Sequence, residues 1–354
     1  IKLKPFVFLF FFLYHFCSLA HAFQMEKEPL PEQIFFQHFS IDDGLSTNNV
    51  LSIEQDSDGF MWFGTESGLN RYDGYKFSKM SREAEDGSIN LNTSVNSLYI
   101  KDNNGLWIGT GALTRYNLQN DTIEAYDVTG NMGLRTISRG EKESLWLGGE
   151  RTGLVKFNIS KRMVTHRYFQ VSFDKTENSD TINAILSGGD RKIWVGTDEG
   201  LFLFDEISEA FSKPVVHPVV NNGRVTSIKL DNHGKLWIGT NNGLFQYDLK
   251  NQKIMQIMIP GENGEVAGSQ QIHSLLVDSK GSIWVGTDKN GIAVIDGQDG
   301  KVSHYPAGIN DPYKIGSGAV SQIFEDRDNG IWFGVQGFGV YRFDRNNQLF
   351  QYFD

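Results

Sequence analysis

The sequence is short of cysteine, proline and basic charge. Among 354 residues there are 1 cysteine and 8 prolines, and 33 lysines and arginines stand against 43 aspartates and glutamates, a net charge of −10. A single cysteine excludes a disulfide framework. So few prolines exclude a collagen-like or proline-rich linker protein. The acidic balance argues against a nucleic-acid-binding protein, which needs a basic face to displace the counterions of phosphates.

Glycine and aromatic residues are abundant instead. Glycine occupies 38 positions and aromatic residues make up 13% of the chain, whereas the usual share of glycine is about 7%. Charged residues account for only 21%, so there is enough apolar surface for a packed core and the composition is not that of a disordered chain. This combination predicts many β-strands joined by tight turns.

The first residues have the three parts of a secretory signal peptide. Lys2 and Lys4 precede an apolar run over residues 5–13, and Ala20-His21-Ala22 supplies small residues for cleavage. We therefore predict a signal peptide over 1–22, a linker over 23–33 and a periplasmic location. The alternative is an N-terminal membrane anchor, although the run is short for a membrane span. Cleavage after Ala22 would also remove Cys17.

The chain is built from one unit repeated seven times. All seven tryptophans lie in a W-x-G-T-like motif, at intervals of 39 to 48 residues. The motifs are centred on Trp62, Trp107, Trp146, Trp194, Trp237, Trp284 and Trp332. Upstream of a motif lies an apolar run with an Asp-x-x-Gly turn, as in 52–59, 227–234 and 274–281. Downstream lies a second glycine turn and an aromatic strand, as in 240–248.

This order of runs and turns predicts a four-stranded antiparallel meander in each unit. Seven meanders indicate an all-β fold, a seven-bladed β-propeller over residues 34–354. Helical and leucine-rich solenoids are excluded because their periodicities are absent. The glycine two residues after each tryptophan is expected to let neighbouring backbones approach closely. The second unit (109–113) and the third (139–144) depart from the pattern and should be irregular blades.

Two further segments compete for one position in the ring. Residues 35–40 resemble the last strand of a preceding blade, and residues 349–353 resemble the last strand of the seventh. Both cannot pair with the same strand edge. Either the N-terminal strand completes blade seven, or the whole protein continues into more blades and a second propeller. We favour the second reading, and we interpret a chain that starts at Ile1 and stops at Asp354 as a fragment.

The repeat is similar to the two-component regulator propeller repeats of bacterial sensor proteins. The best example is D-G-L-S-T-N-N-V-L-S-I-E-Q-D-S-D-G-F-M-W-F-G-T over 43–65, and the resemblance extends over roughly 34–354. It implies a periplasmic sensor region, followed by an immunoglobulin-like domain, a membrane span and a histidine kinase or diguanylate cyclase. It also implies a homodimer of the whole protein. No output motif is present, so we expect no enzyme activity of this segment.

We searched the sequence for catalytic, cofactor and metal sites and predict none. The histidines show no metal-ligand spacing, and no H-E-x-x-H, G-x-S-x-G or phosphate-loop pattern occurs. Asp-rich segments 56–59 and 326–330 are interpreted as tight turns and not as calcium loops, which need more carboxylates and a distant glutamate. The tryptophans are interpreted as core residues and not as a sugar-stacking platform.

A propeller binds ligands at the face where the turns between second and third strands converge with the loops between blades. In those turns the sequence offers these candidates for ligand contact: Glu66, Arg151, Glu199, Asn242, Lys289 and Gln336. His273 lies on the innermost strand of the sixth unit and could line the central channel, or it could be an ordinary satisfied histidine. The longer loops 79–94, 168–181 and 306–318 could frame this face. Solvated turns contain the same polar residues.

Three functions remain open on the sequence. The first is a sensory input module that binds an extracellular ligand or a protein partner; carbohydrate fragments are a common input of the sensors that it resembles. The second is a free periplasmic scaffold that binds proteins. The third is a metal-dependent lyase similar to the streptogramin lyases, in which His273 would act with Glu199 or Glu66. We favour the sensory module.

Overall fold

The computed structural model describes residues 33–80, 91–102, 105–128, 130, 133–169, 181–215, 217–261, 266–267, 270–309, 311 and 313–345. The predicted signal peptide lies outside these ranges. The chain divides into two units, Ile1–Gln33 and Ile34–Asp354, and every strand of the described ranges belongs to the second. Within the same ranges, no helix is both long and apolar enough to cross a membrane.

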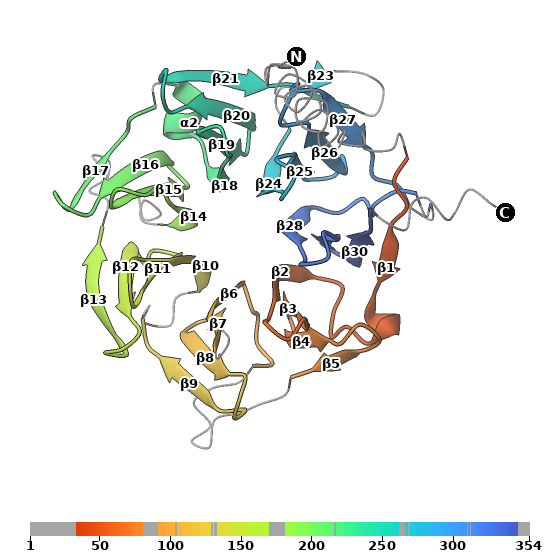
Figure 1. Ribbon diagram of the computed structural model, residues 1–354, viewed down its shortest axis with the longest axis horizontal. Helices are drawn as coiled ribbons and strands as arrows, with labels where there is room; N and C mark the ends of the chain where they lie inside the picture. The colour runs from red at the N-terminus through yellow and green to blue at the C-terminus, as the bar shows by residue number, and fades with distance from the viewer. Residues whose placement is uncertain are drawn as a thin grey trace, which may run out of the picture. The chain divides into compact units, whose positions relative to one another are not determined.

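Seven four-stranded antiparallel sheets surround a central axis in the second unit (Figure 1). The predicted all-β, seven-bladed propeller is therefore confirmed. The two units with irregular sequences are both present as four-stranded blades. In the first six blades the strands follow one another from the axis outwards in chain order.

Each blade up to the sixth takes four consecutive strands. Blades one to four are β2 (Val50–Gln55), β3 (Met61–Thr65), β4 (Gly68–Tyr72), β5 (Phe77–Lys79); β6 (Ser97–Asp102), β7 (Gly105–Gly109), β8 (Leu113–Asn117), β9 (Ile123–Tyr126); β10 (Leu134–Arg139), β11 (Ser144–Gly149), β12 (Leu154–Asn158), β13 (Met163–Tyr168); β14 (Ile182–Ser187), β15 (Lys192–Thr197), β16 (Gly200–Asp205) and β17 (Ala210–Ser212).

Blades five and six are β18 (Val225–Leu230), β19 (Lys235–Thr240), β20 (Gly243–Asp248), β21 (Lys253–Ile257); β24 (Ile272–Val277), β25 (Ile283–Thr287), β26 (Ile292–Ile295) and β27 (Val302–Tyr305). Short elements between blades are the 3-10 helix η2 (Ile41–Asp43), the helix α2 (Pro218–Asn222) and the pair β22 (Ile259–Pro260) and β23 (Val266–Ala267). Blade seven joins β28 (Val320–Glu325), β29 (Ile331–Val335) and β30 (Gly339–Phe343) to β1 (Gln37–Phe39).

The N-terminal strand closes the ring. β1 pairs antiparallel with β30, with His38 opposite Tyr341, and Phe39 stacks on Trp332 at 5.9 Å between ring centroids. The expectation that residues 349–353 supply the outer strand of blade seven is wrong, because β1 already occupies that edge of β30. Residues 349–353 themselves lie outside the described ranges. Whether more blades follow in the whole protein stays a prediction.

The seven tryptophans are core residues, as predicted, and no sugar-stacking platform. None exposes more than 5% of its surface. In blades one, five, six and seven the indole Nε1 donates to the aspartate of the Asp-x-x-Gly turn, at 2.7 to 2.9 Å. In blade five the other oxygen of that aspartate, Asp231 Oδ1, accepts the backbone N–H groups of His233 and Lys235. The turn interpretation is confirmed, and each of these carboxylates also satisfies a buried indole.

The glycine after each tryptophan marks the contact between neighbouring blades. A Cβ on Gly196 would lie 2.6 Å from Cγ1 of Val225, and one on Gly148 would lie 2.5 Å from Cγ2 of Ile182. In both cases the neighbour is the first residue of the next blade's inner strand. The predicted close approach is confirmed, and it occurs between blades.

Candidate functional site

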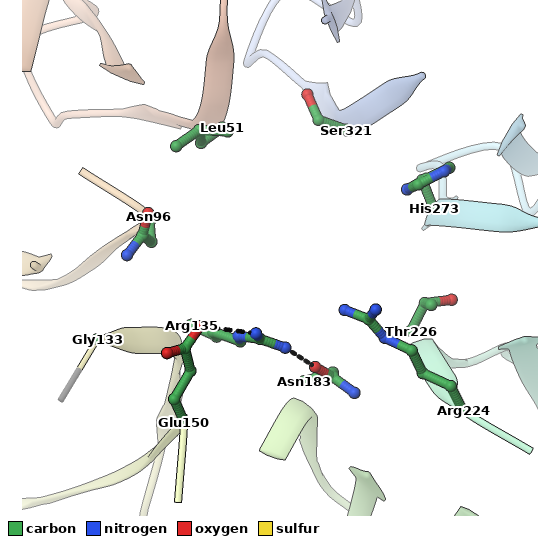
Figure 2. Close-up of a pocket in the computed structure, with 10 residues that line it drawn as sticks. All are labelled: Leu51, Asn96, Gly133, Arg135, Glu150, Asn183, Arg224, Thr226, His273 and Ser321. Atoms are coloured by element: carbon green, nitrogen blue, oxygen red, sulfur yellow. Dashed lines mark hydrogen bonds and ion pairs between the residues drawn. The ribbon is translucent and has the colours of Figure 1, made fainter. Parts of the chain in front are cut away.

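A polar cavity of about 310 Å³ opens on the propeller axis where the inner strands begin. Figure 2 shows the ten side chains and backbone positions that line it. They are Leu51, Asn96, Gly133, Arg135, Glu150, Asn183, Arg224, Thr226, His273 and Ser321. A deeper cavity of about 470 Å³ shares most of these residues and continues along the inner strands.

Seven of the lining residues occupy the same position in the seven repeats. They are Leu51, Asn96, Arg135, Asn183, Thr226, His273 and Ser321. In six blades, all but the second, the pairing between the inner strand and its neighbour shifts by one residue at this position. Such a β-bulge leaves one residue out of the ladder and redirects its side chain. Here it points toward the axis (Figure 2).

Several bulge residues also tie one blade to the next. The Oγ1 of Thr226 donates to the carbonyl of Ile272 at 2.6 Å, and the Oγ of Ser321 donates to the carbonyl of Val50. The amide nitrogen of Asn183 donates to the carbonyl of Val225. The acceptor is each time the first residue of the next blade's inner strand. The lining of the cavity is thus part of the contacts between blades.

Two arginines from neighbouring parts of the ring share a hydrogen-bonded network. Arg135 donates from Nη1 to Oδ1 of Asn183 at 2.6 Å, and from Nη2 to Oε1 of Glu150 at 2.8 Å. The Nδ2 of Asn183 donates to Oδ1 of Asp198 at 2.8 Å. The same oxygen of Asp198 lies 3.1 Å from Nε of Arg224. Blades three, four and five therefore hold both guanidinium groups at the cavity.

His273 stands on the opposite side of the cavity from Arg135 (Figure 2). Its Nε2 lies 3.3 Å from Oδ1 of Asp288. Burial lowers the pKa of His273 below its ordinary value, and the charge of Arg224 adds to this, while Asp288 opposes it. The imidazole is therefore neutral at neutral pH and can both donate and accept a hydrogen bond.

An acid and a base line the deeper cavity. Glu54 lies on β2 and Lys229 on β18. Burial raises the pKa of Glu54 to about 8, although the charge of Lys229 opposes this rise. Burial likewise lowers the pKa of Lys229, and Glu54 opposes that change. The inner channel disfavours an isolated charge of either sign.

The six turn residues singled out from the sequence lie where they were predicted, between the second and third strands of their blades. They are Glu66, Arg151, Glu199, Asn242, Lys289 and Gln336. None of the six lines either axial cavity. The carboxylate of Glu66 accepts from Asn49 Nδ2 at 2.7 Å. At the third blade it is Glu150, one residue before Arg151, that faces the cavity.

Of the residues chosen from the sequence, only His273 lines the axial cavities, and a ligand role for it stays a prediction. The residues at the equivalent position of the other six blades were missed because they share no chemical type. A positional signal existed: each stands one residue before the S-I, S-L, T-I, A-I or Q-I pair of its repeat.

The surroundings of His273 differ from those that the lyase hypothesis names. The carboxylate within hydrogen-bonding distance of His273 belongs to Asp288, whereas the lyase hypothesis needs Glu199 or Glu66. Across the described ranges there is no group of three or more His, Cys, Asp or Glu side chains that could hold a metal ion.

The fold and its repeats define the class of this protein, a seven-bladed propeller of W-x-G-T units around a polar axial cavity. Three of its segments, residues 44–67, 220–242 and 267–289, match the model of the two component regulator propeller family. Each segment contains both a bulge residue and the tryptophan motif. Three segments of the chain thus match repeats of that family, within a seven-bladed propeller.

Solved structures with this fold include extracellular domains from B. thetaiotaomicron. The extracellular domain of BT3049, assigned as a hybrid two component system, is 25% identical with a TM-score of 0.74, over 88% of this chain and 42% of that one. The corresponding domain of BT4673 is 27% identical with a TM-score of 0.72, over 87% of this chain and 39% of that one. The chain therefore spans less than half of either structure.

Of two other similarities, one covers a short segment and the other has low sequence identity. Histidine kinase P4 from Formosa agariphila is 43% identical over 53 residues, which cover 15% of this chain and 4% of the kinase. Virginiamycin B lyase from Staphylococcus aureus has a TM-score of 0.65 at 14% identity, over 87% of this chain and 98% of the lyase. The likeness to the lyase concerns the fold alone.

Proposed function

We propose that this chain is the exported input module of a bacterial transmembrane signalling protein. It binds an extracellular small molecule at the axial cavity and passes the change to a histidine kinase or diguanylate cyclase outside this sequence. The observation that supports this most is the seven-bladed propeller with three segments that match the two component regulator propeller model, which resembles extracellular domains of hybrid two component systems. Location in the periplasm and attachment through a later membrane span are parts of the proposal.

The axial cavity is suited to an input role because its lining also joins the blades. A ligand can shift a conformational equilibrium only by as much as it binds one state better than the other. Thr226 and Ser321 hold hydrogen bonds across blade boundaries, and Asn183 does the same while it binds Arg135. A ligand held by these side chains would favour one arrangement of neighbouring blades over another.

The export step can be tested with a reporter. Residues 1–33, preceded by an initiator methionine, would be fused to alkaline phosphatase, which is active only outside the cytoplasm of a Gram-negative bacterium. We expect full phosphatase activity, and cleavage after Ala22 in the mature fusion. The matched control is Phe10→Asp, because a charge breaks the apolar run that the export machinery needs.

Activity of the fusion equal to that of the Phe10→Asp control, at equal protein levels, would refute export. A fusion that is exported but not cleaved would instead identify the N-terminal segment as a membrane anchor. In that case the propeller would still lie outside the cytoplasm.

A further inference from the structure

We infer that the axial cavity binds a small hydroxylated monocarboxylate, whose carboxylate lies on the guanidinium groups of Arg224 and Arg135. This inference rests on the proposed input function and names the chemical class of the ligand. It follows from how the two arginines are held, from the rest of the cavity wall and from the charge balance of the molecule.

The two guanidinium groups are held in place before any ligand arrives. Arg224 uses Nε for Asp198, and its Nη groups extend into the cavity (Figure 2). Arg135 is fixed by Asn183 and Glu150, and its guanidinium reaches toward the same middle region (Figure 2). A guanidinium presents its N–H groups in a plane that matches a carboxylate, and fixing it in advance reduces the entropy lost on binding.

The remaining wall offers uncharged hydrogen-bonding groups. Asn96 has its Oδ1 bound by the hydroxyl of Ser94, which leaves the amide N–H groups as donors to the cavity. The hydroxyls of Thr226 and Ser321 donate to backbone carbonyls, so toward a ligand they act as acceptors. His273 is neutral because burial lowers its pKa. Such a wall suits ligand hydroxyl groups, which both donate and accept.

The charges favour one carboxylate over several. Glu150 and Asp198 offset the charges of Arg135 and Arg224. Asp288 lies beside the neutral His273 and keeps its negative charge, which disfavours a second anionic group on the ligand. The whole chain carries a net charge of −10 and repels polyanions. A phosphate dianion would need more positive charge than two neutralised arginines supply. The volume, about 310 Å³, lies at the lower end of the range of about 300–1,000 Å³ for small-molecule sites.

The test is isothermal titration of the whole chain with paired ligands. The acids are D-glucuronate, D-galacturonate and D-gluconate, and their neutral counterparts are D-glucose, D-galactose and D-glucitol. We expect at least one acid to bind and its counterpart to bind about 10- to 100-fold more weakly, the usual range for a charged hydrogen-bonded pair. Arg224→Gln and Arg135→Gln should each lose a similar factor.

The control is Arg162→Gln, which removes an arginine that is 60% exposed and paired with Glu124 on an outer strand. It should bind the acid as the unmodified chain does. Equal binding of an acid and its neutral counterpart, unchanged binding by both cavity variants, or no binding of any acid up to about 10 mM would each overturn the inference. These outcomes leave the proposed export intact, since the reporter fusion tests that independently.

Discussion

At the scale of single residues, the repeat places an aspartate and a tryptophan in the core and a further residue at the axial cavity. The aspartate of the Asp-x-x-Gly turn binds turn N–H groups with one oxygen and the indole with the other, as Asp231 does for Trp237. Burying an indole N–H without a partner is costly, so the aspartate and tryptophan recur together in four blades. The bulge residue of the inner strand differs in chemical type from blade to blade, and in three blades it hydrogen-bonds to the next blade.

The pH dependence of stability should trace to Glu54 in the inner channel. With its pKa raised to about 8, Glu54 is protonated in the folded chain at pH values where the unfolded chain has already lost that proton. Its stabilising contribution is complete below about pH 4.5 and declines as the pH rises toward 8. The variant Glu54→Gln should remove this decline.

Urea unfolding at pH 5, 6, 7 and 8 measures the effect. The gain in unfolding free energy from Glu54→Gln should grow with each step in pH, whereas Glu141→Gln, in the exposed turn before β11, should leave the profile of the parent unchanged. Parallel profiles for all three proteins would show that Glu54 is ionised in the folded state at neutral pH.

At the scale of strands and blades, the sequence predicts the elements well because the repeat unit is regular. Seven copies of the same turns and tryptophan motif determine seven meanders, including the two with irregular turns. Ring closure could not be predicted, because segments 35–40 and 349–353 are both aromatic and strand-like. In the structure β1 pairs with the outer edge of β30. There Phe39 stacks on Trp332, and Phe36 meets Phe333 edge-on at 5.8 Å between ring centroids.

The candidate site was harder to predict than the blades. Turn residues such as Glu66 were chosen for their polarity and their place on one face, but polarity does not tell which way a side chain points. The bulge at residues such as Arg135 and Thr226 is a register shift between two strands, and a single strand's sequence does not specify register. Only a comparison of equivalent positions across all the repeats would have indicated the seven residues that line the axial cavity.

Contact between blades should be sensitive to a single added methyl group. In Gly196→Ala the new Cβ would lie 2.6 Å from Val225 and 3.2 Å from Ile228 of the next blade. Overpacking of this kind costs about 1–3 kcal/mol. The control is Gly111→Ala, whose Cβ would have nothing within 4 Å, and whose effect should stay within about 0.5 kcal/mol.

Chemical denaturation of both variants provides the comparison. Gly196→Ala should cost less in a Val225→Ala background than in the parent chain, because the smaller side chain makes room for the new methyl group. Equal stability of the two single variants would mean that the blades do not pack through these glycines.

At the scale of the whole molecule, the propeller is one part of the proposed signalling protein. It presents a polar axial cavity whose lining crosses blade boundaries, and the chain spans 42% and 39% of the solved extracellular domains of BT3049 and BT4673. A module of this kind has a biological effect only if its conformation is coupled to an output domain. The central claim therefore concerns the sequence that comes after this chain in the gene.

The most direct measurement is to sequence the gene beyond the codon for Asp354. The account predicts an open reading frame that continues into an apolar segment of about 20 residues, followed by the motifs of a histidine kinase or a diguanylate cyclase. A stop codon immediately after Asp354, or a continuation with neither a membrane span nor an output domain, would contradict the assignment as an input module.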